Sequence, residues 1–182
     1  MNKFFLELLR NLYYFKYFIF FKRKGKNISL SKGGLINVPN NVELGSNIYI
    51  GRDFKINANG GLEILNNVMI GPNLLVETDD HCFDKIGIQM FTYSEEKICG
   101  KVIIESDVWI GGNVTILKGV KIGEGAIVGA CSLITKDVQP YTISVGIPCR
   151  KIKTRFSRED LERHLQIISS KYTINDLDYI YK

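Results

Sequence analysis

The sequence contains few of the residues that build metal sites and disulfide frameworks. Its 182 residues include two histidines and four cysteines, and no pair of cysteines has the CxxC spacing of a zinc or redox site. We therefore interpret the cysteines as reduced thiols of a cytoplasmic protein, and we expect no metal. These residues are Cys82, Cys99, Cys131 and Cys149.

Long uninterrupted apolar runs are also missing. The N-terminal segment, residues 4–26, is densely aromatic, but Glu7, Arg10 and Lys16 divide it into pieces too short to span a bilayer as a helix. It lacks the cationic start and small-residue cleavage site of a signal peptide. Two interpretations stay open: a helix packed on the protein or on a second subunit, and a peripheral helix on an anionic membrane with the basic residues 22–26 at the headgroups.

Excess charge of one sign is modest. The net charge is +5, and the basic residues are dispersed except at residues 22–26 and 150–155. No recognition motif accompanies these clusters, so we interpret them as solvated charge and expect no nucleic-acid partner. Apolar residues make up 45% and charged residues 24% of the chain, which is typical of a soluble globular protein of one domain.

The dominant positive feature is an aliphatic residue that returns every six positions. In the second half of the chain these residues are Ile104, Ile110, Ile116, Ile122, Val128 and Ile134. Upstream they are Val38, Leu44, Ile50 and Ile56, then, after a step of eight, Ile64, Ile70 and Val76. A period of six is neither helical nor strand-like, and it predicts a coil of three short sides, eighteen residues in all, stacked on its neighbours.

Glycine often follows the inward residue of this repeat. Examples are Gly51, Gly71, Gly111, Gly123 and Gly129. Glycine tolerates a positive φ, so we expect these residues to form the tight corners of the coil.

The repeat is interrupted between Val76 and Ile104, which are 28 positions apart. A loop of roughly twenty residues must leave the coil there, and it contains His81 between acidic residues. Loops on rigid scaffolds often carry reactive groups, and a neutral imidazole is suited to removing a proton from a hydroxyl. The second histidine, His164, follows a helix start at Ser157, and we interpret it as a surface or packing residue.

The segments VWIGGNVTILKGVKIGEGAIVGACSLITKDV and VGIPCRKIK resemble the hexapeptide-repeat acyltransferases. Similarity is greatest to the maltose, galactoside and nodulation-factor O-acetyltransferases and to O-acetyltransferases of bacterial surface polysaccharides. The resemblance runs from Ile36 to Lys153. It implies a mainly β protein, a left-handed parallel β-helix, over residues 28–150 with a loop at about 81–100. Helical segments are expected at residues 1–27 and 151–182.

The resemblance further implies direct acetyl transfer from acetyl-CoA to a sugar hydroxyl of a capsule, lipopolysaccharide or exopolysaccharide. His81 would be the general base, backbone N–H groups near Gly111 and Gly112 would stabilise the oxyanion, and Asn57 would bind the acceptor sugar. Its implied donor contacts are Gly112, Ala130, Thr135, Lys136, Arg150 and Lys153, of which the three cations suit the phosphates of CoA. It also implies a homotrimer with active sites between subunits.

The sequence departs from the family around the histidine, where Asp80-His81-Cys82 replaces the frequent Thr-His-Pro, and in the length of the following loop. Cys82 as a nucleophile is the lesser interpretation, because adjacent residues in an extended chain point to opposite sides. Two other functions stay open: acetylation of another small acceptor (an amino-sugar amine, serine or an antibiotic hydroxyl), and a binding scaffold without catalysis. A carbonic anhydrase would need three histidine ligands.

Overall fold

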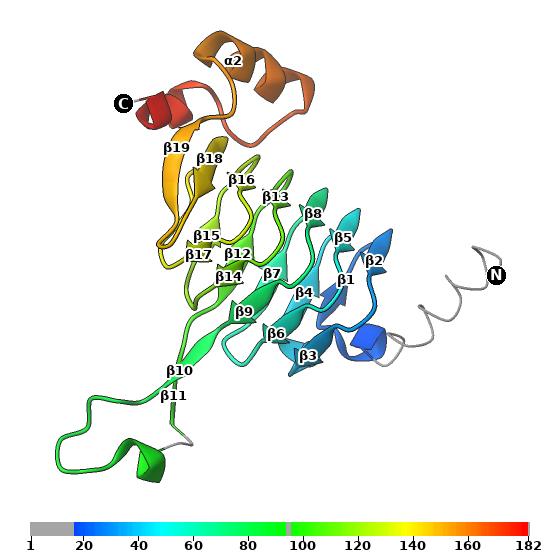
Figure 1. Ribbon diagram of the computed structural model, residues 1–182. Coiled ribbons are helices and arrows are strands. Elements are labelled where there is room, and N and C mark those ends of the chain that lie inside the picture. The colour runs from blue at the N-terminus through cyan, green and yellow to red at the C-terminus, as the bar shows by residue number, and fades with distance from the viewer. Residues whose placement is uncertain (1–16, 94–95, 182) are drawn as a thin grey trace.

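A computed structural model describes residues 17–93 and 96–181, and it shows a stack of triangular coils capped by a helical C-terminal segment (Figure 1). Most of the aromatic N-terminal segment lies outside the described residues. In its described part, residues 17–20 are helical. Among the described residues, no helix is long and apolar enough to cross a membrane.

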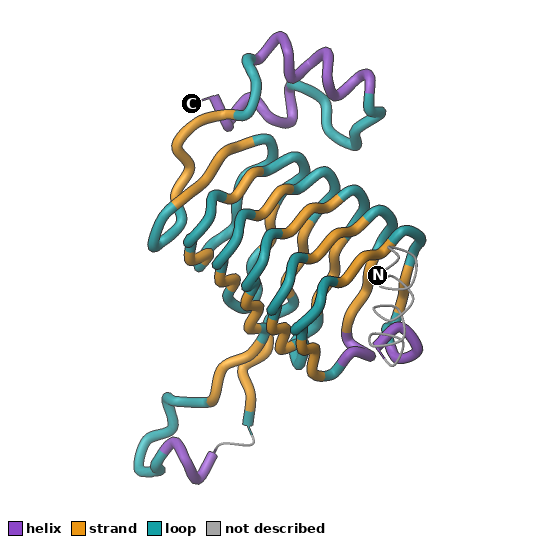
Figure 2. The backbone as a smooth tube through the Cα atoms, turned by 45° about the vertical axis from the view of Figure 1, so that its right-hand side comes forward, coloured by secondary structure: helices purple, strands orange, loops and turns teal. Residues whose placement is uncertain are grey.

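Three parallel sheets form the sides of the coil, and successive coils add one strand to each sheet (Figure 2). Sheet I contains β1 (Arg23–Lys24), β4 (Val42–Leu44), β7 (Leu62–Ile64), β12 (Val102–Ile104) and β15 (Lys121–Ile122). Sheet II contains β2 (Ile28–Leu30), β5 (Ile48–Ile50), β8 (Val68–Ile70), β13 (Trp109–Ile110), β16 (Ile127–Val128), β18 (Thr142–Val145) and the antiparallel β19 (Arg150–Thr154). Sheet III contains β3 (Leu35–Asn37), β6 (Lys55–Asn57), β9 (Leu75–Glu77), β14 (Thr115–Ile116) and β17 (Leu133–Ile134).

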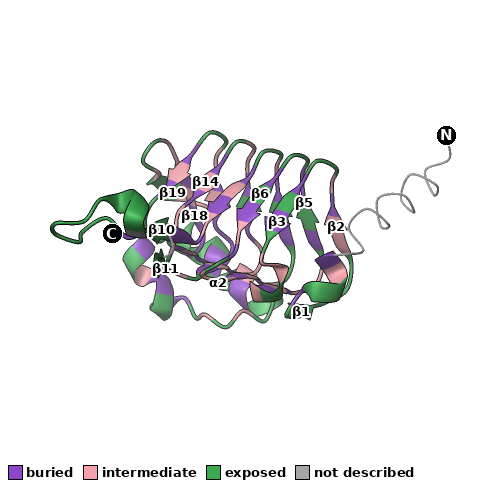
Figure 3. Ribbon diagram, turned by 90° about the horizontal axis from the view of Figure 1, so that it is seen from below, coloured by how far each residue is buried: buried purple, intermediate pink, exposed green. Residues whose placement is uncertain are grey.

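The six-residue pattern corresponds to the inward side chains. Isoleucine, leucine and valine from all three sheets form one elongated core, with Ile64, Ile104, Ile116 and Ile122 fully buried. Figure 3 shows buried and exposed positions alternating along the strands, as the pleat requires. One predicted core position is wrong. Val38 is only half-buried, because it adopts a left-handed conformation before the short 3-10 helix η1 (Pro39–Asn41).

A coil of eighteen residues describes only the last part of the stack. Trp109 pairs with Ile127, eighteen positions later, but Ile48 pairs with Val68, twenty positions later. The extra residues of the early coils lie at the corner between sheets III and I, where η1 and the turn at residues 58–61 stand. The eight-residue step in the sequence marks this longer corner.

The predicted role of the corner glycines is also corrected. Gly51, Gly71 and Gly111 do not adopt positive φ angles. Positive φ angles occur instead at corner asparagines such as Asn47 and Asn67. These asparagines stack, and Asn47 Nδ2 donates to Asn67 Oδ1 at 2.9 Å. The glycines are required for space, since a Cβ at Gly71 or Gly111 would lie 2.6 Å from the backbone of the next coil.

The C-terminal segment covers the end of the coil with a second small core. Helix α2 (Arg158–Ile167) begins at Ser157, whose Oγ accepts a hydrogen bond from the backbone N–H of Asp160, as the sequence predicts. Leu161 and Leu165 of α2 pack with Tyr141 and with residues of the 3-10 helix η3 (Asn175–Tyr181).

A cluster of hydrogen bonds holds this segment to the corner between sheets I and II. The buried Glu105 carboxylate accepts from Lys121 Nζ at 3.0 Å, from Lys171 Nζ at 2.5 Å and from the Tyr172 hydroxyl at 3.2 Å. The neighbouring buried Glu124 accepts from the Tyr141 hydroxyl at 2.6 Å. Burial opposes ionisation of Glu105, but the bonds from Lys171 and Lys121 outweigh it and hold its pKa below the ordinary value of 4.5.

We expect Glu105→Gln to lower the free energy of unfolding by about 2 kcal/mol near neutral pH, because charge-assisted bonds are lost. Since the folded-state pKa is depressed, this stabilisation is present above the ordinary pKa of 4.5 and disappears as the pH falls through the folded value. Urea unfolding at neutral and acid pH measures the difference. Glu162→Gln, on the exposed side of α2, is the control, and an equal effect of both variants contradicts the prediction.

Candidate functional site

The chain leaves the coil between β9 and β12 as a projecting hairpin, here called the arm, residues 79–99 (Figure 1, Figure 2). Its base consists of the antiparallel strands β10 (Asp79–His81) and β11 (Lys97–Cys99), and its distal part includes the 3-10 helix η2 (Met90–Tyr93). Phe83, Ile86 and Phe91 on the arm are largely exposed. The arm therefore carries both His81 and an apolar surface away from the core.

His81 lies on the exposed surface at the base of the arm. It is directly opposite Lys97 in the hairpin, and Lys97 Nζ lies 3.1 Å from His81 Nδ1 and 3.2 Å from Nε2. The same ammonium lies 3.6 Å from Asp79 Oδ2. Because Asp79 and His81 are two residues apart on one strand, their side chains share a side of the arm.

Two amides position the buried carboxylate of Asp79. Asn57 at the end of β6 donates to Asp79 Oδ1 and, at 3.0 Å, to Glu77 Oε2. Asn59 donates to Asp79 Oδ2 at 3.2 Å. Since the Asn57 oxygen also accepts from the backbone N–H of Asn59 at 3.3 Å, a sugar hydroxyl would have to share atoms that are already engaged. Asn57 is linked to the His81 site by its hydrogen bond to Asp79, which lies on the same strand as His81.

Sequence reasoning placed acidic residues beside His81 without singling out Asp79, which pairs with Lys97, and it missed Lys97 as the residue that contacts the ring. Alternation along a strand was a usable signal for Asp79, since it precedes His81 by two positions. Lys97 is sixteen positions away, and only the register of the hairpin brings it to the ring.

The implied donor residues follow sheet III across the last coils. Gly112 and Ala130 lie in successive corners between sheets II and III, and Thr135 and Lys136 follow β17 at the opposite corner. The backbone N–H of Gly111 donates to Val128 O at 2.8 Å and is engaged within the coil, so it is not free to bind an oxyanion.

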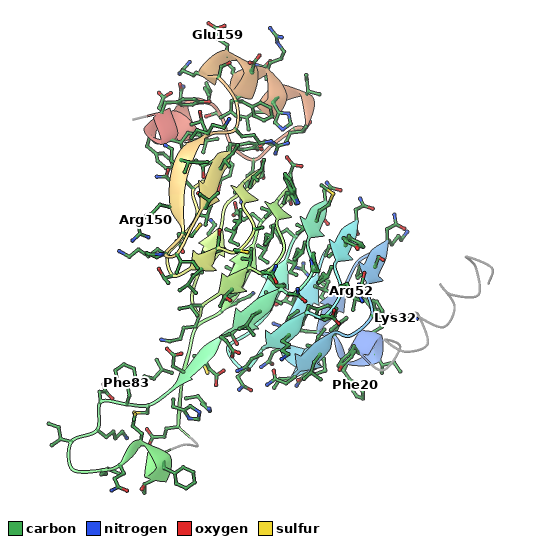
Figure 4. All side chains as sticks on the ribbon, viewed as in Figure 1. Phe20, Lys32, Arg52, Phe83, Arg150 and Glu159 are labelled. Atoms are coloured by element: carbon green, nitrogen blue, oxygen red, sulfur yellow. The ribbon has the colours of Figure 1, made fainter. Side chains whose placement is uncertain are left out.

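Two of the implied phosphate-binding cations line one open groove. This groove of about 560 Å³ is bounded by Lys136, Arg150 and Lys151, with Cys149 and Tyr179 beside them. Arg150 points outward from β19, which forms an antiparallel hairpin with β18 (Figure 4). Lys153 is exposed on the same strand, β19, but it is not among the residues that line the groove.

Among the remaining reactive side chains, Cys82, Cys149 and His164 are buried or partly buried, whereas Cys99 and Cys131 are exposed. Cys82 is buried and its thiol contacts Asp84 Oδ1 at 3.4 Å, while burial raises the pKa of the Cys149 thiol. The His164 ring stacks on Phe156 at a centroid distance of 4.8 Å. Within residues 17–93 and 96–181, no cluster of three histidine, cysteine or acidic side chains has the geometry of a metal site.

Comparisons with known proteins agree on one family. Residues 101–136 match the family model described as bacterial transferase hexapeptide (six repeats). A hexapeptide-repeat acetyltransferase of Vibrio cholerae, solved with acetyl-CoA, superposes with a TM-score of 0.71 at 29% identity, covering 79% of this chain and 76% of that chain. A maltose O-acetyltransferase of Clostridium difficile 630 superposes with a TM-score of 0.68 at 32% identity, covering 78% and 73%.

A curated chloramphenicol acetyltransferase of Klebsiella aerogenes is 47% identical over 68 residues, which are 37% of this chain and 32% of the relative. The chain thus spans about a third of the length of the curated relatives it matches. The structural relatives cover most of both chains and share the parallel β-helix, which confirms the fold predicted from the repeat. The chain belongs to the hexapeptide-repeat acetyltransferases, which fold as left-handed parallel β-helices.

Proposed function

We propose that the protein transfers an acetyl group from acetyl-CoA to a sugar hydroxyl of a bacterial surface glycan or its precursor. The observation that carries this proposal is the position of His81, on an arm at the edge of sheet III, beside the carboxylates and amides of Asp79, Glu77, Asn57 and Asn59. Asn57, Asn59 and Glu77 are half-buried or exposed, and such groups accept from and donate to sugar hydroxyls, whereas Asp79 is buried behind them. The acetyl-CoA complex of the Vibrio cholerae relative supports the donor.

In the proposed reaction, His81 takes the proton of the acceptor hydroxyl as its oxygen attacks the thioester carbonyl. The tetrahedral oxyanion collapses, the carbon–sulfur bond breaks, and the CoA thiolate leaves as the thiol after taking up the proton from the imidazolium. Because Gly111 N–H is engaged, the oxyanion donor is assigned to Gly112 or to a neighbouring subunit. No cysteine nucleophile is needed, and the burial of Cys82 supports a direct transfer.

We assign the donor to the outer side of the last coils. Gly112 and Ala130 would let the pantetheine arm lie close to the corner, Thr135 would contact it, and Lys136, Arg150 and Lys153 would hold the phosphates. The open cationic groove between Lys136 and Arg150 supports this assignment for two of the three cations.

Replacing both groove cations, in Lys136→Met with Arg150→Met, should raise the Michaelis constant for acetyl-CoA about tenfold and change kcat little, because phosphate binding is remote from the thioester. Steady-state kinetics with a fixed acceptor measures both constants. The control variant, Lys32→Met with Arg52→Met, also removes one lysine and one arginine, but at the other end of the coil (Figure 4). It should leave both constants unchanged. Equal effects of the two double variants argue against the groove.

The contrast between two faces of the coil supports a homotrimer. Sheet I has paired charges on its outer side, with Glu63 bonded to Arg23 at 2.8 Å and to Lys101 at 2.7 Å. Sheet II instead presents Tyr49, Met69 and Trp109 in register, each about half exposed. An apolar stripe of this kind is typical of a surface covered by another subunit. In the proposed trimer, the arm of one subunit reaches the donor residues of the next.

The acceptor is proposed to be large or lipid-linked, made in the cytoplasm close to the membrane. Exposed aromatic residues on the arm, Phe83 and Phe91, suit stacking on sugar rings. Ile19 and Phe20 are also exposed at the end of the N-terminal segment, which supports contact of residues 4–26 with a membrane or with another subunit (Figure 4). The second candidate acceptor is an antibiotic hydroxyl, favoured by the similarity to chloramphenicol acetyltransferase.

Incubation with acetyl-CoA and a panel of acceptors tests the proposal. The panel contains lipid-linked and nucleotide-linked sugars, surface polysaccharide, free maltose and chloramphenicol, and mass spectrometry detects the added acetyl group. We expect acetylation of a surface-glycan precursor. Acetylation of chloramphenicol alone would favour the second candidate. If none of these acceptors causes release of CoA, the glycan proposal has no support.

A further inference from the structure

The C-terminal segment, residues 156–181, forms one wall of the open groove that is bounded by Lys136 and Arg150. Tyr179 of η3 lines this groove, and Figure 1 shows η3 beside β19 at the end of the coil. The donor residues assigned above all precede residue 154, so none of them belongs to this wall. The C-terminal segment therefore adds to the groove a group that the hexapeptide motifs do not contain.

Tyr179 is fixed at this wall by its neighbours in η3. Leu177 and Ile180 are fully buried in the second small core, whereas Tyr179 is 46% exposed. Lys151 Nζ donates to the carbonyl oxygen of Ile180, which ties η3 to β19. The backbone on both sides of Tyr179 is thus held in place, and the partly exposed ring has a defined position at the groove.

A neutral polar group of the same groove is the amide of Gln139. This residue follows Lys136 by three positions and is exposed at the corner after β17. Its carbonyl oxygen accepts from the Thr142 hydroxyl at 2.7 Å, which fixes the backbone while the side chain stays accessible to a ligand. The side-chain amide of glutamine matches N6 and N7 of adenine, because it donates to N7 and accepts from the N6 amino group.

Together these groups match the adenosine end of CoA. The ribose of CoA carries adenine, a 3′-phosphate and a 5′-diphosphate, so that adenine lies one sugar away from every phosphate. Lys136 and Arg150 supply cations for the phosphates, and the face of Tyr179 suits stacking on a base. The carboxylate of Asp137 also lines the groove, but it is engaged within the coil, where it accepts from the backbone N–H of Lys121 at 2.8 Å.

We propose that the C-terminal segment completes the donor groove. Tyr179 stacks on the adenine ring of CoA, and Gln139 binds the N6 and N7 edge of that ring. This inference rests on the proposed donor site and adds a base-specific part to it. The protein then binds adenosine 3′,5′-bisphosphate even without the pantetheine arm, and it selects adenine over guanine.

Isothermal titration calorimetry of the full chain tests the stack without any acceptor. The ligands are CoA, adenosine 3′,5′-bisphosphate and 4′-phosphopantetheine, which lacks the base. Tyr179→Ala should weaken binding of the first two about tenfold, the usual effect of losing one contact between a base and an aromatic ring, and should leave binding of 4′-phosphopantetheine unchanged. Tyr179→Phe keeps the ring and should bind all three ligands as the wild type does.

Gln139→Leu tests the contact with the edge of the base. The wild type should bind adenosine 3′,5′-bisphosphate about tenfold more tightly than guanosine 3′,5′-bisphosphate, because a bidentate amide discriminates between the two bases. The variant should bind both nucleotides with similar affinity. A preference for adenine that Gln139→Leu leaves unchanged would overturn the assignment of Gln139.

Tyr172→Ala is the matched control, because Tyr172 belongs to the same segment but lines a different depression, with Leu165 and Ile174. This variant should bind CoA as the wild type does. Unchanged CoA affinity in Tyr179→Ala would overturn the stack. An equal loss in Tyr172→Ala would overturn it too, since loosening of the segment would explain both results.

The outcome for adenine is separate from the outcome for acetyl transfer. If the wild type binds CoA and Tyr179→Ala weakens it as expected, but no glycan is acetylated, the proposed acceptor is wrong and the adenine contact stands. If the wild type binds neither CoA nor adenosine 3′,5′-bisphosphate, both the donor groove and the adenine contact are wrong.

Discussion

We expect His81→Ala to lower kcat of acetyl transfer about 10²- to 10⁴-fold, the usual contribution of a positioned general base. The side chain is exposed on the arm, so its removal should leave the free energy of unfolding within about 0.5 kcal/mol of the wild type. The Michaelis constant for acetyl-CoA should change little, because the proposed donor residues lie on other coils. Turnover with the preferred acceptor and urea unfolding measure these quantities separately.

Cys82→Ala is the control for this prediction. Cys82 is adjacent in sequence but buried, and we expect the variant to retain most of its turnover. Comparable losses in the two variants would reverse the assignment and make the thiol the candidate nucleophile. A loss confined to His81→Ala would agree with direct transfer.

The second large effect is expected on association. Met69→Glu combined with Trp109→Glu places two carboxylates on the apolar stripe of sheet II, and an unpaired charge in a closed apolar contact costs several kcal/mol. Light scattering should change from the mass of a trimer to that of a monomer. Turnover should be lost with it, because the proposed site combines an arm and donor residues from different subunits.

Ile103→Glu provides the matched control, because Ile103 is an outward apolar residue among the charges of sheet I. This variant should keep the wild-type mass and turnover. A monomeric Met69→Glu, Trp109→Glu protein that still turned over at the wild-type rate would contradict a shared site, even if association through sheet II were correct.

The repeat allowed the core to be predicted with few errors. Ile104, Ile110, Ile116 and Ile122 are all buried as expected, because burial in a coil of short sides depends on local spacing alone. The error at Val38 and the coils of twenty residues have a common origin. The corner between sheets III and I is longer in the early coils, and corner conformation depends on the neighbouring coils rather than on the spacing of aliphatic residues.

The glycines illustrate a different limit. Their positions were predicted correctly as corners, but the reason for them was not. A positive φ is a local property that asparagine also tolerates, and Asn47 and Asn67 adopt it while stacking on each other. The absence of a Cβ at Gly71 and Gly111 is required by the distance to the next coil, which is set by stacking.

The sequence by itself determined the coiled architecture, the inward residues and the interruption that carries His81, because all three follow from a period readable along the chain. Only the tertiary structure decided which side chains surround His81. Asn57, Asp79 and Lys97 converge through parallel stacking of β6 on β9 and through the antiparallel register of the arm. These pairings join residues about twenty positions apart, and no local pattern specifies which residue will lie opposite which.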